Sequence, residues 1–207
     1  MRTYVYVDAF NLFYGCLKGR PHKWLNLAAL CRHQLQPHHV IVRIKYFTAL
    51  VSARDDPDRP NRQQLYLRAL RTIPEVRIYF GKFQTHERRM PAVVPPGVKQ
   101  TYATVSWTNE KGSDVNLATH LLSDAYEGRF AAAVVITGDS DLVAPIRLVA
   151  QNLGLTVGIL NPQHRASRSL VRAATFYERI RPGTLAASVF PDQLTDSKGV
   201  FHKPPSW

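Results

Sequence analysis

The sequence feature that most constrains the fold is a short apolar run at residues 131–136, followed directly by a Thr-Gly-Asp-Ser-Asp motif at residues 137–141. A continuous, partly β-branched run of this length is typical of a strand buried on both faces of a parallel sheet. Open α/β sheets bind their ligands beyond the carboxyl ends of such strands, so we expect Asp139 and Asp141 to lie at a ligand-binding edge. The alternative is that Asp139 or Ser140 caps a following helix, but a cap requires only one of these side chains.

Strand-like and helix-like patterns alternate along the rest of the chain. Runs rich in β-branched and aromatic residues, which favour strands, lie at residues 3–7, 40–47, 76–83, 155–160 and 176–180. Amphipathic helical patterns lie at residues 25–35, 63–73, 115–125 and 142–152, and a short helix is expected from residue 12. This order predicts one α/β domain at residues 1–181, with a doubly wound, mainly parallel sheet of about five or six strands and helices on both faces.

Two segments depart from this alternation. Residues 84–109 contain clustered basic residues and prolines, and we expect an inserted loop or hairpin there that either contacts a nucleic-acid backbone or has no ligand role. Residues 182–207 are rich in Pro, Gly, Ser and Thr, so we expect an extended or disordered C-terminal tail. Within the domain, the carboxylates of residues 55–60 are interleaved with Arg and Pro, which predicts a solvated loop rather than a site.

The charge balance favours a polyanionic partner. The 207 residues include 27 Lys and Arg against 15 Asp and Glu, a formal net charge of +12, although basic surfaces also serve solubility or contact anionic lipid. Cys16 and Cys31 lack the close paired spacing of zinc ligands, and two cysteines are too few for a disulfide scaffold. Because the chain enters a strand-like run at once and has no apolar stretch of membrane-spanning length, we expect a cytoplasmic protein without a membrane partner.

Two further carboxylates, Asp8 and Asp114, add to the acidic motif. Asp8 ends the first predicted strand, and Asn11 can point into the same crevice; the alternative for Asp8 is to cap the next helix. Ser113 is the expected N-cap of a later helix, which puts Asp114 in its first turn. Asp114 shares the apolar face of that helix, and a carboxylate on a face that turns inward needs a partner.

This arrangement predicts metal chemistry. Four carboxylates packed at one edge of a sheet would repel each other and take up protons unless a cation neutralises them. Mg²⁺ or Mn²⁺ suits such a site, because hard divalent ions bind carboxylate and water oxygens and keep positions open for phosphate oxygens. We therefore expect a Mg²⁺ or Mn²⁺ site for phosphodiester hydrolysis. Its expected ligands are Asp8, Asp114, Asp139 and Asp141.

Three motifs resemble, in their order, the NYN domain, a branch of the PIN-like nucleases. They are Asp8-Ala9-Phe10-Asn11, Glu110-Lys111-Gly112-Ser113-Asp114-Val115 and Thr137-Gly138-Asp139-Ser140-Asp141. The resemblance spans roughly residues 3–180 and implies a PIN-like fold with a metal-dependent ribonuclease site. It implies that Asp8, Asp114, Asp139 and Asp141 are the acidic residues of the family's site, with Asn11 as their polar companion. Thr137 and Ser140 belong to the third motif as accessory residues.

The leading prediction is a metal-dependent endoribonuclease that favours single-stranded RNA. The sequence leaves open whether DNA is also a substrate and whether the chain forms a homodimer. Its expected catalytic residues are Asp8, Asn11, Asp114, Asp139 and Asp141. The basic residues expected to bind nucleic acid are Lys111, Arg88, Arg89, Lys99, Arg165 and Arg168.

Two other functions compete with this prediction. The first is an RNA-binding module with a non-catalytic or weakly catalytic metal site, against which the intact set of four aspartates argues. The second is a metal-dependent phosphatase of the haloacid dehalogenase type. That chemistry needs a second Asp two residues after the nucleophile on the first strand, and here Phe10 follows Asp8 at that distance.

Overall fold

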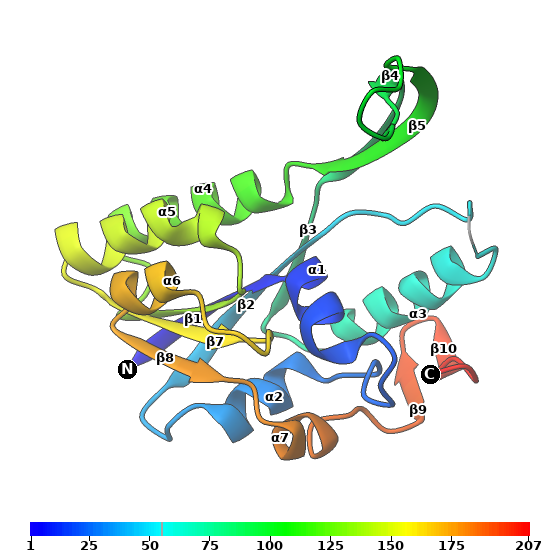
Figure 1. Ribbon diagram of the computed structural model, residues 1–207. Helices are drawn as coiled ribbons and strands as arrows, with labels where there is room; N and C mark the ends of the chain where they lie inside the picture. Colours follow the sequence, from blue (N-terminus) through cyan, green and yellow to red (C-terminus); the bar gives the residue numbers. More distant parts are fainter. Residues whose placement is uncertain (55) are drawn as a thin grey trace.

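A parallel sheet of six strands forms the centre of the molecule in the computed structural model, which describes residues 1–54 and 56–207 (Figure 1). The strands are β1 (Arg2–Asp8), β2 (Val40–Thr48), β3 (Val76–Phe80), β6 (Ala132–Ile136), β7 (Thr156–Asn161) and β8 (Phe176–Arg179). They lie in the order β3-β2-β1-β6-β7-β8, and every neighbouring pair is parallel.

Helices cover both faces of this sheet. One face carries α1 (Ala9–Leu12), the π-helical turn Phe13–Leu17, α2 (Leu27–Gln34), α3 (Arg59–Arg71) and α7 (Pro182–Ala186). The other face carries α4 (Ser113–Tyr126), the 3-10 turn Ser140–Leu142, α5 (Val143–Arg147), the π-helical turn Leu148–Asn152 and α6 (Arg168–Ala173). The predicted doubly wound α/β fold is confirmed. Within the described part of the chain, no helix combines the length and the apolar composition required to cross a bilayer.

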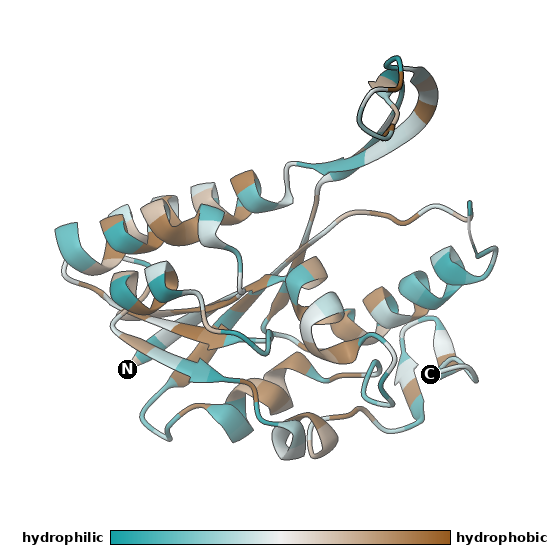
Figure 2. Ribbon diagram, viewed as in Figure 1, coloured by the Kyte–Doolittle hydropathy of each residue, from teal (hydrophilic) through white to brown (hydrophobic). Residues whose placement is uncertain are grey.

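The central strands divide the core into two layers. In β1, Val5 and Val7 face α2 while Tyr6 faces α4, because successive side chains of a strand point to opposite faces. Strand β6 is buried along its whole length, as its continuous apolar run predicts. Figure 2 shows apolar residues concentrated on the central strands and on the helix segments beside them. Each fully buried Leu or Val in these layers contributes about 1.5–3 kcal/mol to stability.

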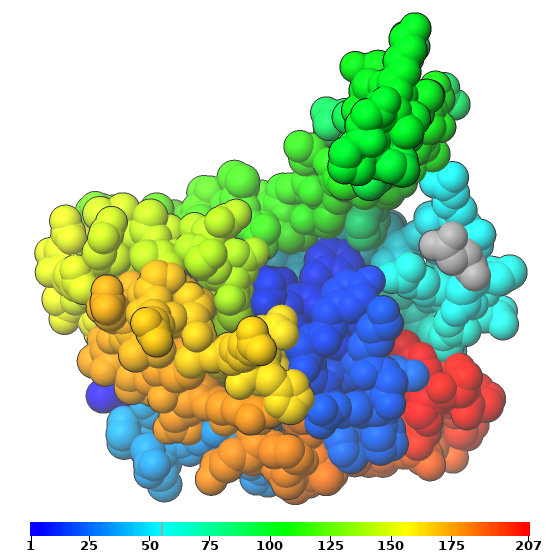
Figure 3. Space-filling model, in the orientation of Figure 1, coloured from blue at the N-terminus to red at the C-terminus, as the bar shows by residue number. Residues whose placement is uncertain are grey.

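The insertion forms a long β-hairpin that projects from the body of the protein (Figures 1 and 3). Of the two alternatives, a loop or a hairpin, the chain adopts the hairpin, in which β4 (Lys82–Pro91) pairs antiparallel with β5 (Tyr102–Lys111). The single strand predicted at residues 76–83 was wrong, because the chain breaks at Gly81 between β3 and β4. A Cβ added at Gly81 would lie 2.7 Å from the Lys111 carbonyl oxygen, so glycine allows the base of the hairpin to close.

The prediction of an extended or disordered tail was wrong. Residues 182–207 form α7 and a small hairpin of β9 (Gln193–Asp196) and β10 (Gly199–His202). Phe190 and Phe201 are buried, with their ring centroids 5.8 and 6.4 Å from that of Trp24. Arg68 on α3 forms two hydrogen bonds, of 2.8 and 2.7 Å, with the Asp196 carboxylate. The polar composition of this segment hides a few well-placed aromatic residues, and these are enough to fix it to the core.

Candidate functional site

The candidate site lies where the order of the strands reverses. From β1 the sheet continues through β2 and β3 on one side, and through β6, β7 and β8 on the other. In doubly wound folds the crevice beyond the carboxyl ends of two such central strands is the usual ligand site. Here β1 ends at Asp8, and β6 ends one residue before Thr137. The two motifs predicted at strand ends therefore meet at this edge.

Asp8 links the ends of the two central strands. Its side chain is buried, and its Oδ1 accepts a hydrogen bond from the Asn11 backbone N–H at 2.9 Å, which caps α1. Its Oδ2 accepts a hydrogen bond from the Thr137 hydroxyl at 3.1 Å. Burial raises the pKa of Asp8 above its ordinary value, although these hydrogen bonds oppose the shift. Asp8 is therefore both a helix cap and a wall of the crevice.

Asn11 holds the loop after β6 against the loop after β7. Its Oδ1 accepts hydrogen bonds from the Gly138 N–H at 3.1 Å and from Gln163 Nε2 at 3.2 Å. A Cβ added at Gly138 would lie 2.6 Å from Gln163 Cγ and 2.9 Å from Asn161 Oδ1, so the close approach of these loops requires glycine. The amide of Asn11 thus orients the motif that carries Asp139.

The three polar residues that follow Gly138 are not equivalent. Asp139 is half-buried, and its Oδ1 accepts a hydrogen bond from the Asp141 N–H at 2.9 Å, which caps the 3-10 turn. The Asp139 N–H in turn donates to the Thr137 hydroxyl at 3.0 Å. Ser140 and Asp141 are exposed, and neither lines the crevice. Asp139 is the carboxylate of this motif that faces the site.

Asp114 approaches the site from the start of α4. The expected N-cap at Ser113 was wrong, because Gly112, with φ of 99°, precedes the helix and Ser113 is already helical. Ser113 is buried, and its N–H and hydroxyl donate to Glu110 Oε1 at 3.1 and 2.8 Å. The pKa of Asp114 is raised to about 6, first by burial and then by the negative charges of Asp8, Asp139 and Glu110, with Asp141 last. The negative charges of several carboxylates therefore interact in this site.

Asp8, Asp114 and Asp139 line a cavity of about 680 Å³. Figure 3 shows the hairpin overhanging α1 and the start of α3, and the cavity lies beneath this overhang. Its other walls come from α1, the loop after β2, the start of α3 and the base of the hairpin. Besides the three aspartates it is lined by Phe10, Asn11, Tyr14, Val51, Ser52, Arg54, Arg59, Phe83, Ser106, Thr108 and Glu110.

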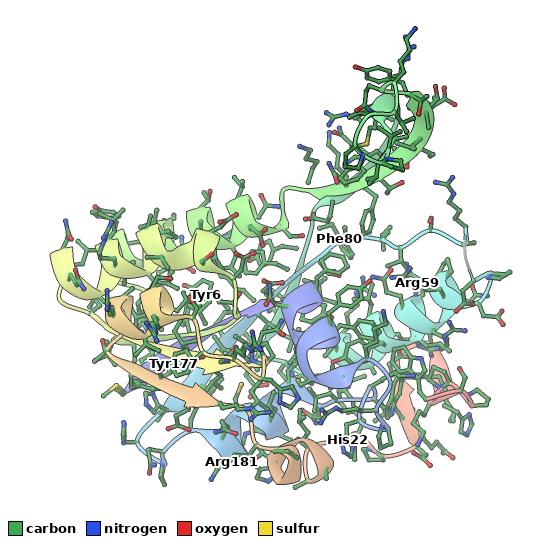
Figure 4. The ribbon with its side chains drawn as sticks, viewed as in Figure 1. Tyr6, His22, Arg59, Phe80, Tyr177 and Arg181 are labelled. Atoms are coloured by element: carbon green, nitrogen blue, oxygen red, sulfur yellow. The ribbon has the colours of Figure 1, made fainter. Side chains whose placement is uncertain are left out.

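Two arginines that the sequence did not identify also line this cavity. Arg54 Nη1 donates to the Ser106 hydroxyl at 3.0 Å, which ties the loop after β2 to the hairpin. Arg59, labelled in Figure 4, begins α3, and its Nη2 donates to the Tyr14 hydroxyl at 3.3 Å. The sequence predicted a solvated loop at residues 55–60; Asp55 lies outside the described residues, but Arg59 belongs to the site. No local pattern distinguishes these arginines, since contacts distant in sequence place them.

The predicted set of four carboxylate ligands does not form one cluster. Across residues 1–54 and 56–207, no three Asp, Glu, His or Cys side chains gather closely enough to hold a metal ion. Asp141 is exposed and does not line the cavity, whereas Asp114 lines it from the first turn of α4, the position predicted from the sequence. Asp8 and Asp139 remain as oxygen donors at adjacent strand ends. Mg²⁺ is commonly held by one or two carboxylates with water completing its shell, and these residues fit an ion of that kind.

The six basic residues predicted to bind nucleic acid lie outside the cavity, on two separate parts of the molecule. The hairpin carries Arg88, Arg89, Lys99 and Lys111, all exposed. The guanidinium carbon of Arg89 lies 5.0 Å from the ring centroid of Tyr102, which is also exposed. Arg165 and Arg168 are exposed in the loop after β7 and at the start of α6.

The chain is similar to known proteins over most of its length. A model of the NYN domain matches residues 2–180. The 6-hydroxy-3-succinoylpyridine 3-monooxygenase HspA of Pseudomonas putida is 30% identical over 236 aligned residues, and the match covers 100% of this chain and 75% of that protein. Among solved structures, a protein of unknown function from Vibrio parahaemolyticus is similar with a TM-score of 0.58 and 15% identity, covering 91% of this chain and 96% of that one. That likeness concerns the fold alone.

Proposed function

This chain belongs to the NYN domain family of nuclease-like proteins, and we propose that it is a metal-dependent endoribonuclease that hydrolyses phosphodiester bonds of single-stranded RNA. The observation that supports this most is the cavity that Asp8, Asp114 and Asp139 line together. Burial raises the pKa of Asp114 most, and the negative charges of the neighbouring carboxylates raise it further; a divalent cation would relieve that repulsion.

Asp8 and Asp139 are the residues that would hold Mg²⁺ or Mn²⁺. When bound, such an ion lowers the pKa of its water and offsets charge on a phosphate. Thr137 orients the Asp8 carboxylate and holds the backbone of Asp139, since its hydroxyl donates to Asp8 and accepts from the Asp139 N–H. Because Asp114 lines the same cavity, we assign it the role of accepting a hydrogen bond from the attacking water.

Two arginines give the acidic cavity an attraction for its substrate. Arg54 and Arg59 line it beside the carboxylates, and guanidinium groups bind phosphate oxygens through paired, charge-assisted hydrogen bonds. In this proposal they hold the phosphates on either side of the scissile bond. Without these arginines, the negative charges of the carboxylates would repel the phosphates of an RNA backbone.

The hairpin supports a single-stranded substrate. It presents exposed Arg88, Arg89 and Lys99 together with exposed aromatic rings at Tyr102 and Trp107. Cations and aromatic rings on one hairpin suit a single strand, whose phosphates pair with the charges while its unstacked bases lie on the rings. The net charge of +12 agrees with a polyanionic partner.

The test is cleavage of an end-labelled single-stranded RNA by the purified protein in Mg²⁺ or Mn²⁺. We expect cleavage that is lost in EDTA and in Asp139→Asn, and retained in Asp192→Asn. The Asp192 variant is the matched control, because it also removes one carboxylate, but from an exposed pair with Lys203 away from the cavity. RNA binding without cleavage in either metal, or full activity in Asp139→Asn, would contradict the proposal.

A second candidate function is oxygenation of a substituted pyridine or similar ring. It rests on the 30% identity to HspA, whose name describes it as a 6-hydroxy-3-succinoylpyridine 3-monooxygenase. A monooxygenase places one atom of O₂ in its product and reduces the other to water, so the reaction needs a two-electron donor. Aerobic incubation with that pyridine and reduced nicotinamide cofactor tests it: loss of both compounds would support this candidate, and loss of neither would exclude this substrate.

A further inference from the structure

A second cavity lies beside the acidic one and differs from it in character. It has a volume of about 540 Å³ and lies between α1 with its π-helical turn, β2, α3 and the C-terminal Trp207. Its size falls within the range of about 300–1,000 Å³ that is usual for small-molecule sites. Four residues, Phe10, Tyr14, Val51 and Arg59, line both cavities and form a shared wall.

The interior of this second cavity is aromatic. Side chains from four separate parts of the chain turn their rings into it: Phe10, Phe13, Tyr46, Tyr66 and Trp207. The Tyr66 and Trp207 ring centroids are 5.8 Å apart, and those of Tyr46 and Tyr66 are 6.3 Å apart, both edge to face. Rings arranged in this way offer both faces and edges to an inserted planar ring. Aromatic contacts of this kind stabilise binding by more than the buried area alone accounts for.

The Tyr46 hydroxyl can bind a ligand inside this cavity. The Tyr66 hydroxyl donates to the Leu25 carbonyl at 2.9 Å, and both ends of the Gln63 amide are taken by the backbone at Ala49 and Val51. The Tyr46 side chain is only 7% exposed, and its hydroxyl has no hydrogen-bond partner among the described residues. Because Tyr46 lines the cavity, a ligand with a ring nitrogen or carbonyl oxygen can accept a hydrogen bond from this hydroxyl.

The mouth of the cavity attracts anions. Among the described side chains, its lining includes the cations Lys18, Lys23, Arg59 and Arg62 and one carboxylate, that of Asp56, which is paired with Arg62. Lys18, Lys23 and Arg59 form no ion pair with the described residues. Three uncompensated cations at one opening raise the local concentration of anions.

We propose that this second cavity is a binding site for a planar heteroaromatic ring that carries an anionic group. The ring lies among Phe10, Tyr66 and Trp207, a polar atom of the ring meets the Tyr46 hydroxyl, and the anionic group lies at the mouth with Arg59. Two kinds of compound share this chemistry: nucleoside monophosphates and heteroaromatic carboxylates. Binding here requires no divalent ion, so the site is separable from the proposed RNA cleavage.

The test is isothermal titration calorimetry of the full-length protein in EDTA. The probes are adenosine 5′-monophosphate and pyridine-3-carboxylate, one for each source of the ligand. Adenosine supplies a ring without the anion, and ribose 5-phosphate supplies an anion without the ring. We expect at least one of the two probes to bind more tightly than both of these comparison compounds. Adenosine monophosphate alone, pyridine carboxylate alone, or both, would each support the site and would identify its source.

Two variants test the contacts separately. Tyr46→Phe keeps the ring and should weaken binding about three- to tenfold through loss of one hydrogen bond. Arg59→Gln should weaken binding of the anionic probe about tenfold or more. Tyr177→Phe is the matched control, since its buried hydroxyl also has no partner among the described residues but lies on β8, at the other edge of the sheet (Figure 4). Circular dichroism confirms that each variant is folded.

Three results would overturn this site. They are no binding of either probe in EDTA, equal affinity of ribose 5-phosphate and the ring-bearing probes, and unchanged affinity in both Tyr46→Phe and Arg59→Gln. Failure of RNA cleavage leaves this outcome untouched, because no metal and no RNA are present in the measurement.

Discussion

The hydroxyl of Thr137 donates to Oδ2 of Asp8 at 3.1 Å, across the boundary between β6 and β1. The same hydroxyl accepts the Asp139 N–H at 3.0 Å. One buried side chain without charge therefore holds the carboxylate of Asp8 and the backbone of Asp139, which are far apart in the sequence. Thr137 thus links two residues of the acidic cavity, although its own side chain cannot act as an acid or a base there.

Thr137→Val tests this arrangement. Valine has nearly the same shape but leaves Asp8 Oδ2 and the Asp139 N–H without their partner, so the free energy of unfolding should fall by about 1–3 kcal/mol. RNA cleavage should fall about 10- to 100-fold, the usual cost of losing a group that orients metal ligands. Urea denaturation and single-turnover cleavage measure the two effects. Thr137→Ser is the control that keeps the hydroxyl and should retain most activity; equal losses in both variants would count against the role of the hydroxyl.

Asp114 makes stability depend on pH in a defined direction. Its pKa rises from the ordinary 3.8 to about 6 in the folded protein. Between these values the folded state binds more protons than the unfolded state, so the free energy of unfolding decreases as pH rises through this window. In Asp114→Asn this dependence should be weaker, while Asp192→Asn should keep it. Urea denaturation in EDTA at a series of pH values provides the comparison, and identical profiles for all three proteins would refute the assignment.

A divalent ion should reverse the shift at Asp114. A nearby cation favours the ionised carboxylate, so saturating Mg²⁺ should lower the pKa of Asp114 from about 6 toward its ordinary value. Carbon-detected NMR titration of the Asp114 carboxyl group, with and without Mg²⁺, measures this directly. A midpoint that Mg²⁺ does not move would mean that no ion binds between Asp8 and Asp139.

The hairpin should govern how RNA binding responds to salt. Arg88 and Arg89 are exposed on β4, and each phosphate contact on a single strand contributes about 0.7 to the slope of log affinity against log salt. Replacing both with Gln should reduce that slope by about 1.4. Arg71→Gln, which removes an exposed cation in the last turn of α3, is the control and should leave the slope unchanged. Fluorescence anisotropy with labelled RNA measures the slopes; equal slopes for the double variant and the control would show that the hairpin does not contact phosphates.

Adjacent residues in the C-terminal hairpin should differ sharply in their effect on stability. Phe201 is 4% exposed and packs on Trp24, with the Arg68 guanidinium carbon 4.1 Å from its ring centroid, whereas Val200 is 54% exposed. Phe201→Ala should lower the free energy of unfolding by about 3–5 kcal/mol, and Val200→Ala by no more than about 0.5 kcal/mol. Thermal and urea denaturation distinguish them. Equally small effects would show that the tail does not pack on the core.

The fold was predictable because its strongest signals are local. The run at residues 131–136 has the length and composition of a doubly buried strand, and it forms β6 with all five of its residues buried. The order of strands and helices then leaves few topologies open. Asp8 and Asp139 could be placed at one edge for the same reason, since the carboxyl ends of parallel strands meet there.

The remaining parts of the site depend on contacts that no local pattern encodes. Arg54 reaches the cavity because its guanidinium bonds to Ser106, 52 residues away in sequence. Ser113 is a conventional cap residue by type, yet Glu110 occupies its hydroxyl and Gly112 takes the cap position. The tail was mispredicted because average composition outweighed Phe190 and Phe201, whose partner Trp24 lies at the other end of the chain.

The packing of Trp24 also sets an order of events during synthesis. Trp24 follows the first strand, but its neighbours Phe190 and Phe201 come much later in the sequence and are synthesised long after it. The Trp24 indole N–H donates to the Pro191 carbonyl, so this hydrogen bond also forms only after residue 191 has been synthesised. A nascent chain that has already formed β1 and β2 therefore keeps one apolar face uncovered until residues 190–201 leave the ribosome, and this face is where chaperones would be expected to bind.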